Sequence, residues 1–231
     1  MSLYDAHVHL DYMSNAREVA LEARERGIRL FANTVTPQGY VRTSKLLSDL
    51  ENVDVGLGLH PWWVRQASLD EFLLRLPSTR WVGEVGLDFS PKRAHHDLQR
   101  EVFERIAGSC ADLGNKTLSI HSVRSASSVL DILERTGCLD TCTCIFHWFS
   151  GSTDDLWRAI HDGCWFSVNE MQAKTRRAKE QLKLIPNERL LFETDYPPAE
   201  DMRFSAECIE SSLIKAMELT AQIRKGQTPH R

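Results

Sequence analysis

Short apolar segments alternate with longer amphipathic segments from one end of the chain to the other. The short segments are rich in β-branched and aromatic residues, which is typical of buried strands. We predict strands at residues 3–10, 30–35, 53–59, 81–89, 117–121, 143–149, 164–168 and 190–194. The longer segments place apolar residues three and four positions apart, and we predict helices at residues 15–27, 39–50, 68–76, 95–113, 125–135, 153–161, 171–184 and 204–223. Gly27, Gly114, Gly137 and Gly163 follow four of these helices, where glycine commonly ends a helix.

Strict alternation of strands and helices predicts parallel strands, because each helix returns the chain to the edge where the next strand begins. Dividing 231 residues among eight such units gives about 29 per unit, close to the roughly 30 of a βα crossover unit. We therefore predict one domain over residues 1–231, a compact (β/α)8 TIM barrel of the α/β class. The alternative is a doubly wound open sheet, which normally has a glycine-rich phosphate loop after its first strand. Here that place holds His7-Val8-His9.

Polar side chains recur at the ends of the predicted strands, where parallel barrels carry their catalytic residues. Two residues apart on a strand, His7 and His9 share one face and suit a single divalent cation. Taken singly, each strand-end residue has an ordinary explanation: a satisfied polar side chain, a buried ion pair or a turn. Together, four imidazoles and two carboxylates at one barrel mouth would be difficult to desolvate without a metal. The set is His7, His9, Glu84, His121, His147 and Asp195.

Composition narrows the class of protein. The formal net charge is −4, so the chain has no long-range basic field, and any nucleic-acid affinity must come from a local patch or from bound metal ions. The N-terminal residues lack the features of a signal peptide, and no apolar run has the length of a membrane span. We expect a cytoplasmic protein, not bound to a membrane, whose six cysteines are reduced. Cys138, Cys142 and Cys144 would suit a soft metal ion, but small residues in and beside a buried strand are the favoured interpretation.

The strand-end motifs, taken in order, resemble the TatD family of metal-dependent deoxyribonucleases, within the amidohydrolase superfamily. The resemblance runs from residue 5 to about residue 197, and the combined set is far more specific than any one motif. The motifs are His7-Val8-His9-Leu10-Asp11, Gly58-Leu59-His60-Pro61, Gly83-Glu84-Val85-Gly86-Leu87-Asp88-Phe89, His121-Ser122, His147-Trp148-Phe149-Ser150-Gly151 and Glu193-Thr194-Asp195-Tyr196-Pro197.

The resemblance implies a division of labour around two divalent ions, Mg²⁺, Mn²⁺ or Zn²⁺. His7 and His9 would bind one ion, Glu84 would bridge the two, and His121 and His147 would bind the second. Asp195 would bind a metal and orient or deprotonate the attacking water, so Asp195 and Glu84 are the expected catalytic residues. His60 would lie near the substrate phosphate. Imidazole ligands suit Zn²⁺ or another transition metal better than Mg²⁺, so the identity of the ion stays open.

Two departures from the family pattern affect the substrate side. An arginine commonly lies two residues after the strand-five histidine, but here Val123 holds that position and Arg124 follows it. We expect Arg124 to contact the substrate phosphate, which requires its loop to follow a different path. The region after residue 198 is also shorter than the family leads us to expect. Short members of the family occur in bacterial defence gene clusters, so protein partners in a bacterial defence system are an open expectation.

Aromatic and basic residues near the mouth bear on the substrate. Trp62 would either stack on a base of single-stranded nucleic acid or pack under the loops, and packing is favoured for Phe149. A basic run follows the seventh strand and would be either a track for a nucleic-acid backbone or a solvated helix face. Its members are Lys174, Arg176, Arg177, Lys179 and Lys183.

Three functions compete. The leading hypothesis is a metal-dependent DNase, a 3′–5′ exonuclease on single-stranded ends, with DNA as the expected partner. The second is an amidohydrolase-type enzyme that cleaves a small amide, ester or phosphoester. The third is a metal-binding subunit of a bacterial defence complex, against which the complete ligand set argues. An open groove with basic and aromatic residues would favour the nuclease, and a closed pocket would favour the small substrate.

Overall fold

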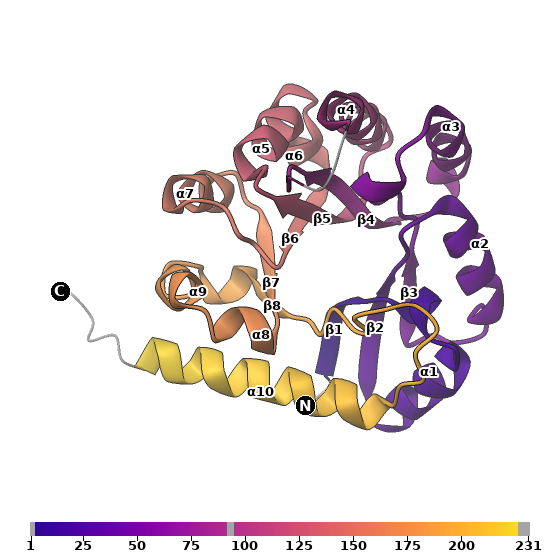
Figure 1. The fold of residues 1–231 in the computed structure, drawn as a ribbon, viewed down its shortest axis with the longest axis vertical. Helices are drawn as coiled ribbons and strands as arrows, with labels where there is room; N and C mark the ends of the chain where they lie inside the picture. Colours follow the sequence, from indigo (N-terminus) through magenta and orange to yellow (C-terminus); the bar gives the residue numbers. More distant parts are fainter. Residues whose placement is uncertain (1–2, 92–94, 226–231) are drawn as a thin grey trace.

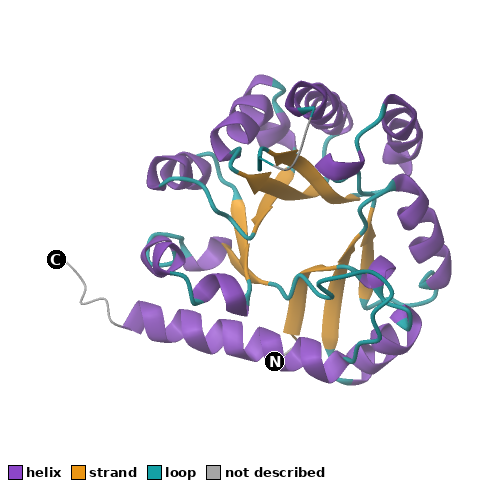
Figure 2. Ribbon diagram, in the orientation of Figure 1, coloured by secondary structure: helices purple, strands orange, loops and turns teal. Residues whose placement is uncertain are grey.

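Parallel strands form a closed ring with helices around it in the computed structural model, which describes residues 3–91 and 95–225 (Figure 1). Figure 2 shows the strands at the centre and the helices on the outside. Within the described residues the strands are β1 (Leu3–Val8), β2 (Ile28–Asn33), β3 (Val53–Gly56), β4 (Trp81–Asp88), β5 (Thr117–Val123), β6 (Thr143–His147), β7 (Trp165–Val168) and β8 (Leu190–Phe192).

Helices follow the strands in the order that the sequence predicts. The α-helices are α1 (Ala16–Glu25), α2 (Pro37–Leu46), α3 (Gln66–Arg75), α4 (His96–Leu113), α5 (Ala126–Arg135), α6 (Cys138–Thr141), α7 (Thr153–His161), α8 (Glu170–Ala173), α9 (Arg176–Gln181) and α10 (Ala206–Lys225). Short 3-10 helices are η1 (Leu10–Tyr12), η2 (Pro61–Trp63), η3 (Leu76–Ser78) and η4 (Asn187–Arg189). The four glycines expected to follow helices all have a positive φ, which a glycine adopts without steric penalty.

The ladders form two parallel sheets, β1-β2-β3 and β4-β5-β6-β7-β8, and local contacts join them into the barrel. A parallel bridge between Leu57 and Val82 connects β3 to β4. On the other side, the backbone N–H of Asp195 donates to the carbonyl of His7 at 2.8 Å, beyond the end of β8. This arrangement agrees with the predicted barrel and not with an open doubly wound sheet.

The helix predicted at 171–184 and the strand predicted at 53–59 differ from the elements in the structure. One helix was expected at 171–184, but the structure has α8 and α9 instead, because Thr175 adopts an extended conformation and caps the second helix through the backbone N–H of Ala178. The strand expected at 53–59 ends at Gly56. Beyond it, Leu57 and Leu59 still donate backbone hydrogen bonds to β4, so the chain stays extended up to His60.

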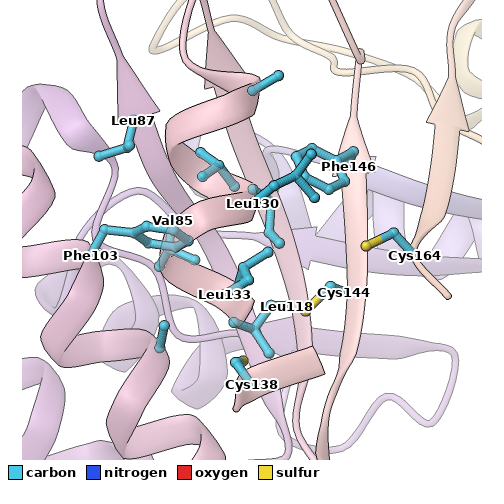
Figure 3. Packing of buried hydrophobic residues seen from close by; sticks show 14 of the residues in the cluster. Val85, Leu87, Phe103, Leu118, Leu130, Leu133, Cys138, Cys144, Phe146 and Cys164 are labelled. Carbon is cyan, nitrogen blue, oxygen red and sulfur yellow. The ribbon is translucent and has the colours of Figure 1, made fainter. Parts of the chain in front are cut away.

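The larger core cluster lies between β4–β7 and the helices that cover them, and Figure 3 shows Phe103, Leu118 and Phe146 packed there with Cys138, Cys144 and Cys164. The cysteines are free, and burial raises the pKa of the Cys164 thiol to about 12. Among the described residues, the clusters that could hold a metal ion contain no cysteine. Cys138, Cys144 and Cys164 therefore act as small apolar core residues, and the half-buried Cys142 packs against the same cluster, which agrees with the interpretation favoured from the sequence.

None of the helices in residues 3–91 and 95–225 combines the length and apolar character needed to cross a membrane.

Gly58 lies where β3 runs into the mouth of the barrel, and its backbone passes very close to β2. A Cβ atom added there would lie 1.5 Å from the carbonyl oxygen of Thr34. We expect Gly58→Ala to destabilise the fold by about 3 kcal/mol, because the clash is with rigid backbone. Gly108→Ala on α4 is the control: its nearest neighbour would be 4.0 Å away, and alanine favours a helix by up to about 1 kcal/mol. Urea unfolding of both variants checks this, and equal stabilities would contradict the close approach.

Candidate metal centre

The predicted site residues meet at the carboxyl ends of the strands, around a cavity of about 430 Å³. His7 is fully buried beside the cavity. Trp62, expected on the substrate side, is about half exposed and also lines it. The other predicted residues that line it are His9, His60, Glu84, His121, His147 and Asp195. The predicted convergence of these strand ends therefore agrees with the structure, whereas the ligand and catalytic roles of the residues stay predictions.

Glu84 on β4 divides its two carboxylate oxygens between two groups of donors, and its Oε2 faces the first. This oxygen lies 3.4 Å from His9 Nε2 and 3.8 Å from His7 Nε2. The two Nε2 atoms are 3.2 Å apart. Asp195 Oδ1 completes the group, 3.3 Å from His9 Nε2 and 3.7 Å from His7 Nε2. His7, His9 and Asp195 thus form a compact cluster able to hold one cation.

The other oxygen of Glu84, Oε1, faces a second group of imidazoles. It lies 2.7 Å from His121 Nδ1 and 2.9 Å from His147 Nε2. His60 Nε2 is 3.3 Å from the same oxygen. His60, Glu84 and His121 form a further cluster of the size that holds an ion. The structure therefore places His60 against the second donor group, closer to the centre than a purely substrate-side position requires.

This donor set fits divalent metal ions. Each oxygen of one buried carboxylate faces its own nitrogen donors, and a bridging carboxylate needs that arrangement. His147 Nδ1 is a buried polar atom without a hydrogen-bond partner among the described residues, and its ring stacks on His7 with centroids 4.0 Å apart. Nitrogen-rich donors favour zinc and other transition-metal ions over magnesium.

The pKa values show how the charges balance when protons occupy this site. Burial alone would raise the pKa of Glu84, but nearby imidazoles, led by His60 and His147, hold it well below its usual range. Burial disfavours a cation at His9, yet its hydrogen bond with Asp195 and the charge of Glu84 raise its pKa to about 10. Burial and the charge of His147 keep the pKa of His7 well below normal. A bound cation would replace the protons that otherwise neutralise Glu84.

Outer residues orient the imidazole rings. Ser119 Oγ on β5 lies 2.7 Å from His7 Nδ1, which leaves His7 Nε2 directed at the centre. His9 Nδ1 lies 2.8 Å from the carbonyl oxygen of Asn33, with the same consequence for His9 Nε2. Such contacts choose the tautomer of a ligand histidine and its direction.

Asp88 at the end of β4 connects the second donor group to the wall of the cavity. Its Oδ2 lies 3.4 Å from His121 Nε2 and accepts a hydrogen bond of 2.6 Å from the indole N–H of Trp62. The position of an aromatic wall residue is thereby tied to that of a candidate ligand.

Two buried acids were missed as site residues in the sequence, Asp5 and Glu193. Asp5 accepts hydrogen bonds from the backbone N–H of Thr194 at 3.0 Å and from its hydroxyl at 2.6 Å. Burial raises the pKa of Asp5 to about 7, although hydrogen bonds from Thr194 oppose the shift. Glu193 Oε1 lies 3.9 Å from His147 Nδ1. Each acid precedes a predicted site residue by two positions, so strand alternation could have found both.

The remaining predicted substrate-side residues differ in position. Arg124 is exposed and does not line the cavity, so its contact with substrate stays a prediction. Phe149 is buried, as favoured from the sequence. In the basic run, Lys174 pairs with Glu170 and Lys183 with Glu180. Such local pairing is typical of a solvated helix face.

Comparison with known proteins settles the family. The family described as TatD related DNase matches residues 4–229. The chain belongs to the TatD family of metal-dependent hydrolases. YabD of Bacillus subtilis, described as a metal-dependent hydrolase, is 25% identical over 92% of this chain and 87% of its own length. The 3′-5′ ssDNA/RNA exonuclease TatD of Pantoea vagans is 26% identical over 84% of this chain and 79% of its own.

Solved structures confirm the fold of this TatD-family chain. The crystal structure of YJJV, a TatD homolog from Escherichia coli, superposes with a TM-score of 0.78 at 20% identity, over 97% of this chain and 94% of that one. The resemblance drawn from the strand-end motifs and the predicted TIM barrel are both confirmed.

Ser119 offers a test of the outer contacts in this TatD-family site. We expect Ser119→Ala to weaken divalent-ion binding about tenfold, because His7 loses the hydrogen bond that orients its ring. Ser122→Ala is the matched control on the same strand, since the Ser122 hydroxyl has no hydrogen-bond partner among the described residues. Ion affinity measured by competition with a chromophoric chelator checks this. Equal affinities for the two variants would show that Ser119 does not position His7.

Proposed function

We propose that this chain is a metal-dependent phosphodiesterase that removes nucleotides from the 3′ ends of single-stranded DNA. The observation that carries the proposal is Glu84, whose two oxygens face separate donor groups beside a cavity with aromatic walls. Membership of the TatD family supports hydrolysis, and the exonuclease of Pantoea vagans supports the choice of nucleic acid. A protein partner in a bacterial defence system stays a prediction.

The residues that would hold the ions follow from the two donor groups. His7, His9 and Asp195 would hold one ion, and His121 and His147 the other, with Glu84 shared between them. Two divalent ions bound there (Mg²⁺, Mn²⁺ or Zn²⁺) would supply positive charge that polarises a phosphoryl oxygen and makes a water molecule a better nucleophile.

Asp195 is suited to accept the proton of the attacking water. Its side chain is about one-fifth exposed, lines the cavity and carries an oxygen 3.3 Å from His9 Nε2. Its backbone has a φ of +57°, an unusual conformation that the hydrogen bond to the carbonyl of His7 holds in place. A carboxylate on this backbone, at the edge of the cavity, would be suited to act as the general base.

His60 is suited to donate a hydrogen bond to a phosphoryl oxygen. Its Nδ1 accepts a hydrogen bond from the backbone N–H of Trp62 at 3.1 Å. The neutral ring then carries its proton on Nε2, the nitrogen that faces the second donor group. A protonated Nε2 suits substrate contact better than metal ligation, which supports the role that the family resemblance implies.

The walls of the cavity favour flat, aromatic groups. Tyr12, Trp62 and Trp148 line it, and lysine and arginine are absent from its described lining. Stacking on such rings binds the bases of single strands with little regard to sequence. The attraction for phosphate would then come from the ions and not from fixed basic side chains.

A second candidate is hydrolysis of a small ester, amide or phosphoester. The volume of the cavity, about 430 Å³, lies within the range of small-molecule pockets, and this size favours the second candidate. The two functions differ in whether activity rises with the length of a nucleotide chain.

Glu84→Ala and Asp195→Asn test the site together with the function. We expect both variants to lose about 100-fold or more in cleavage of labelled single-stranded DNA, because each removes a group that acts on the reacting atoms. Glu207→Ala is the control, because Glu207 is an exposed carboxylate in the first turn of α10 that does not line the cavity. Circular dichroism and bound-metal analysis separate lost chemistry from lost folding.

Wild-type protein is assayed on single- and double-stranded DNA with Mg²⁺, Mn²⁺ and Zn²⁺ in turn, and with a chelator. No cleavage under any of these ions would end the nuclease proposal. Cleavage by both variants at the wild-type rate would instead show that the assigned site is wrong.

Trp62→Ala separates the two candidate functions. We expect a rise of about tenfold in KM for a single-stranded oligonucleotide, because base stacking contributes on the order of 1–3 kcal/mol. The KM for bis(p-nitrophenyl) phosphate should change less, since it carries no base. Trp157→Ala on α7, where the tryptophan is about half exposed, is the control. An equal change for both substrates would count against base stacking.

A further inference from the structure

A second cavity, of about 190 Å³, adjoins the first at the mouth of the barrel. The two cavities share Tyr12 and Val35 in their linings. The second cavity extends to Arg42 on α2 and to Trp63 on η2. It therefore lies on the side of the loops that follow β1, β2 and β3, next to the metal centre.

Three aromatic rings, those of His9, Tyr12 and Trp63, lie in sequence from the first cavity to the second. Tyr12 stacks on His9, with ring centroids 5.1 Å apart and an interplanar angle of 24°. The side chain of Trp63 lies close enough to the Tyr12 hydroxyl to oppose the rise in pKa that burial causes there. Trp63 remains 42% exposed. Trp63 in the second cavity is thus connected to His9, a candidate metal ligand, through the ring of Tyr12.

Arg42 gives the second cavity a cation with no partner. Within residues 3–91 and 95–225 it makes no hydrogen bond or ion pair, whereas Arg17 and Arg26 both pair with carboxylates. Among the described residues that line either cavity, Arg42 is the only lysine or arginine. An unpaired guanidinium beside a phosphodiester site suits a phosphate group.

We propose that the second cavity binds the nucleotide on the leaving side of the scissile phosphate, with its base against Trp63 and its outer phosphate on Arg42. This inference rests on the proposed function. A strand whose scissile phosphate lies at the metal centre reaches the second cavity by crossing Tyr12, the ring that both cavities share.

The acidic residues of the second cavity limit what else it binds. Asp11 and Glu200 also line it, so the cavity is not a general trap for anions. The side chain of Asp11 is only 4% exposed, and one of its oxygens accepts a hydrogen bond from the backbone N–H of Val35. A nucleotide fits this mixed lining better than free phosphate does. Its phosphate would face Arg42, and its sugar and base offer hydrogen-bond donors to the acidic residues.

Two dinucleotides that differ by one phosphate test the role of Arg42. The wild-type protein is assayed on d(TpT) and on d(pTpT), which carries an additional phosphate on the leaving-side nucleotide. We expect kcat/KM to be about fivefold to tenfold higher for d(pTpT), because the outer phosphate pairs with the guanidinium. Arg42→Ala should remove this preference. It should also reduce the slope of log KM for d(pTpT) against log salt concentration by about 0.7, because one phosphate contact is lost.

Lys45→Ala is the matched control, since Lys45 is an exposed cation on the same helix, and it should keep the preference. Trp63→Ala should raise KM for d(pTpT) about tenfold, and Trp63→Phe should recover part of that loss because a ring remains. If wild-type protein prefers neither dinucleotide and Arg42→Ala behaves like Lys45→Ala, the subsite is wrong while the nuclease stands. If wild-type protein cleaves no oligonucleotide at all, both proposals fail.

Discussion

The buried carboxylate of Glu84 is the group on which the site depends. An ionised carboxylate at 4% exposure is stable only when charged or polar partners surround it. Imidazoles from other strand ends provide those partners, three at Oε1 and two at Oε2. The barrel makes this possible because its parallel strands deliver all these side chains to one end. Removing the carboxylate would leave the histidines without their common partner, and removing the histidines would leave the carboxylate buried alone.

Closure of the barrel beside β8 depends on a second buried carboxylate. Asp5 binds both the backbone N–H and the hydroxyl of Thr194, which lies 189 positions away in the sequence. Because Thr194 is next to Asp195, this contact also determines where Asp195 can direct its oxygens. Fold closure and the position of the proposed general base therefore rest on the same hydrogen bonds, so a change that loosens one would displace the other.

Features that depend on local periodicity could be predicted from the sequence, whereas contacts that form only when the barrel closes could not. Alternation placed His7 and His9 on one face, and the order of strand ends predicted that they would meet Glu84. The break between α8 and α9 was hidden, because the helical spacing of apolar residues continues across Thr175. The contact between Tyr12 and Trp63 and the hydrogen bonds of Asp5 with Thr194 join loops and strands that only the closed ring brings together, so no local sequence pattern predicts them.

Fixed positive charge is scarce around the reacting centre, which bears on how the proposed enzyme would bind its substrate. The described lining of the main cavity has aromatic rings but no lysine or arginine, and the net charge of the chain is −4. Attraction for a phosphodiester at the reacting centre would then come from bound ions, since neither lysine nor arginine is present in this described lining. Affinity and reactivity would share one source, whereas the rings would add affinity through the bases. Selectivity for a nucleotide chain would therefore arise at the walls, and the donors around Glu84 would serve any substrate that the walls admit.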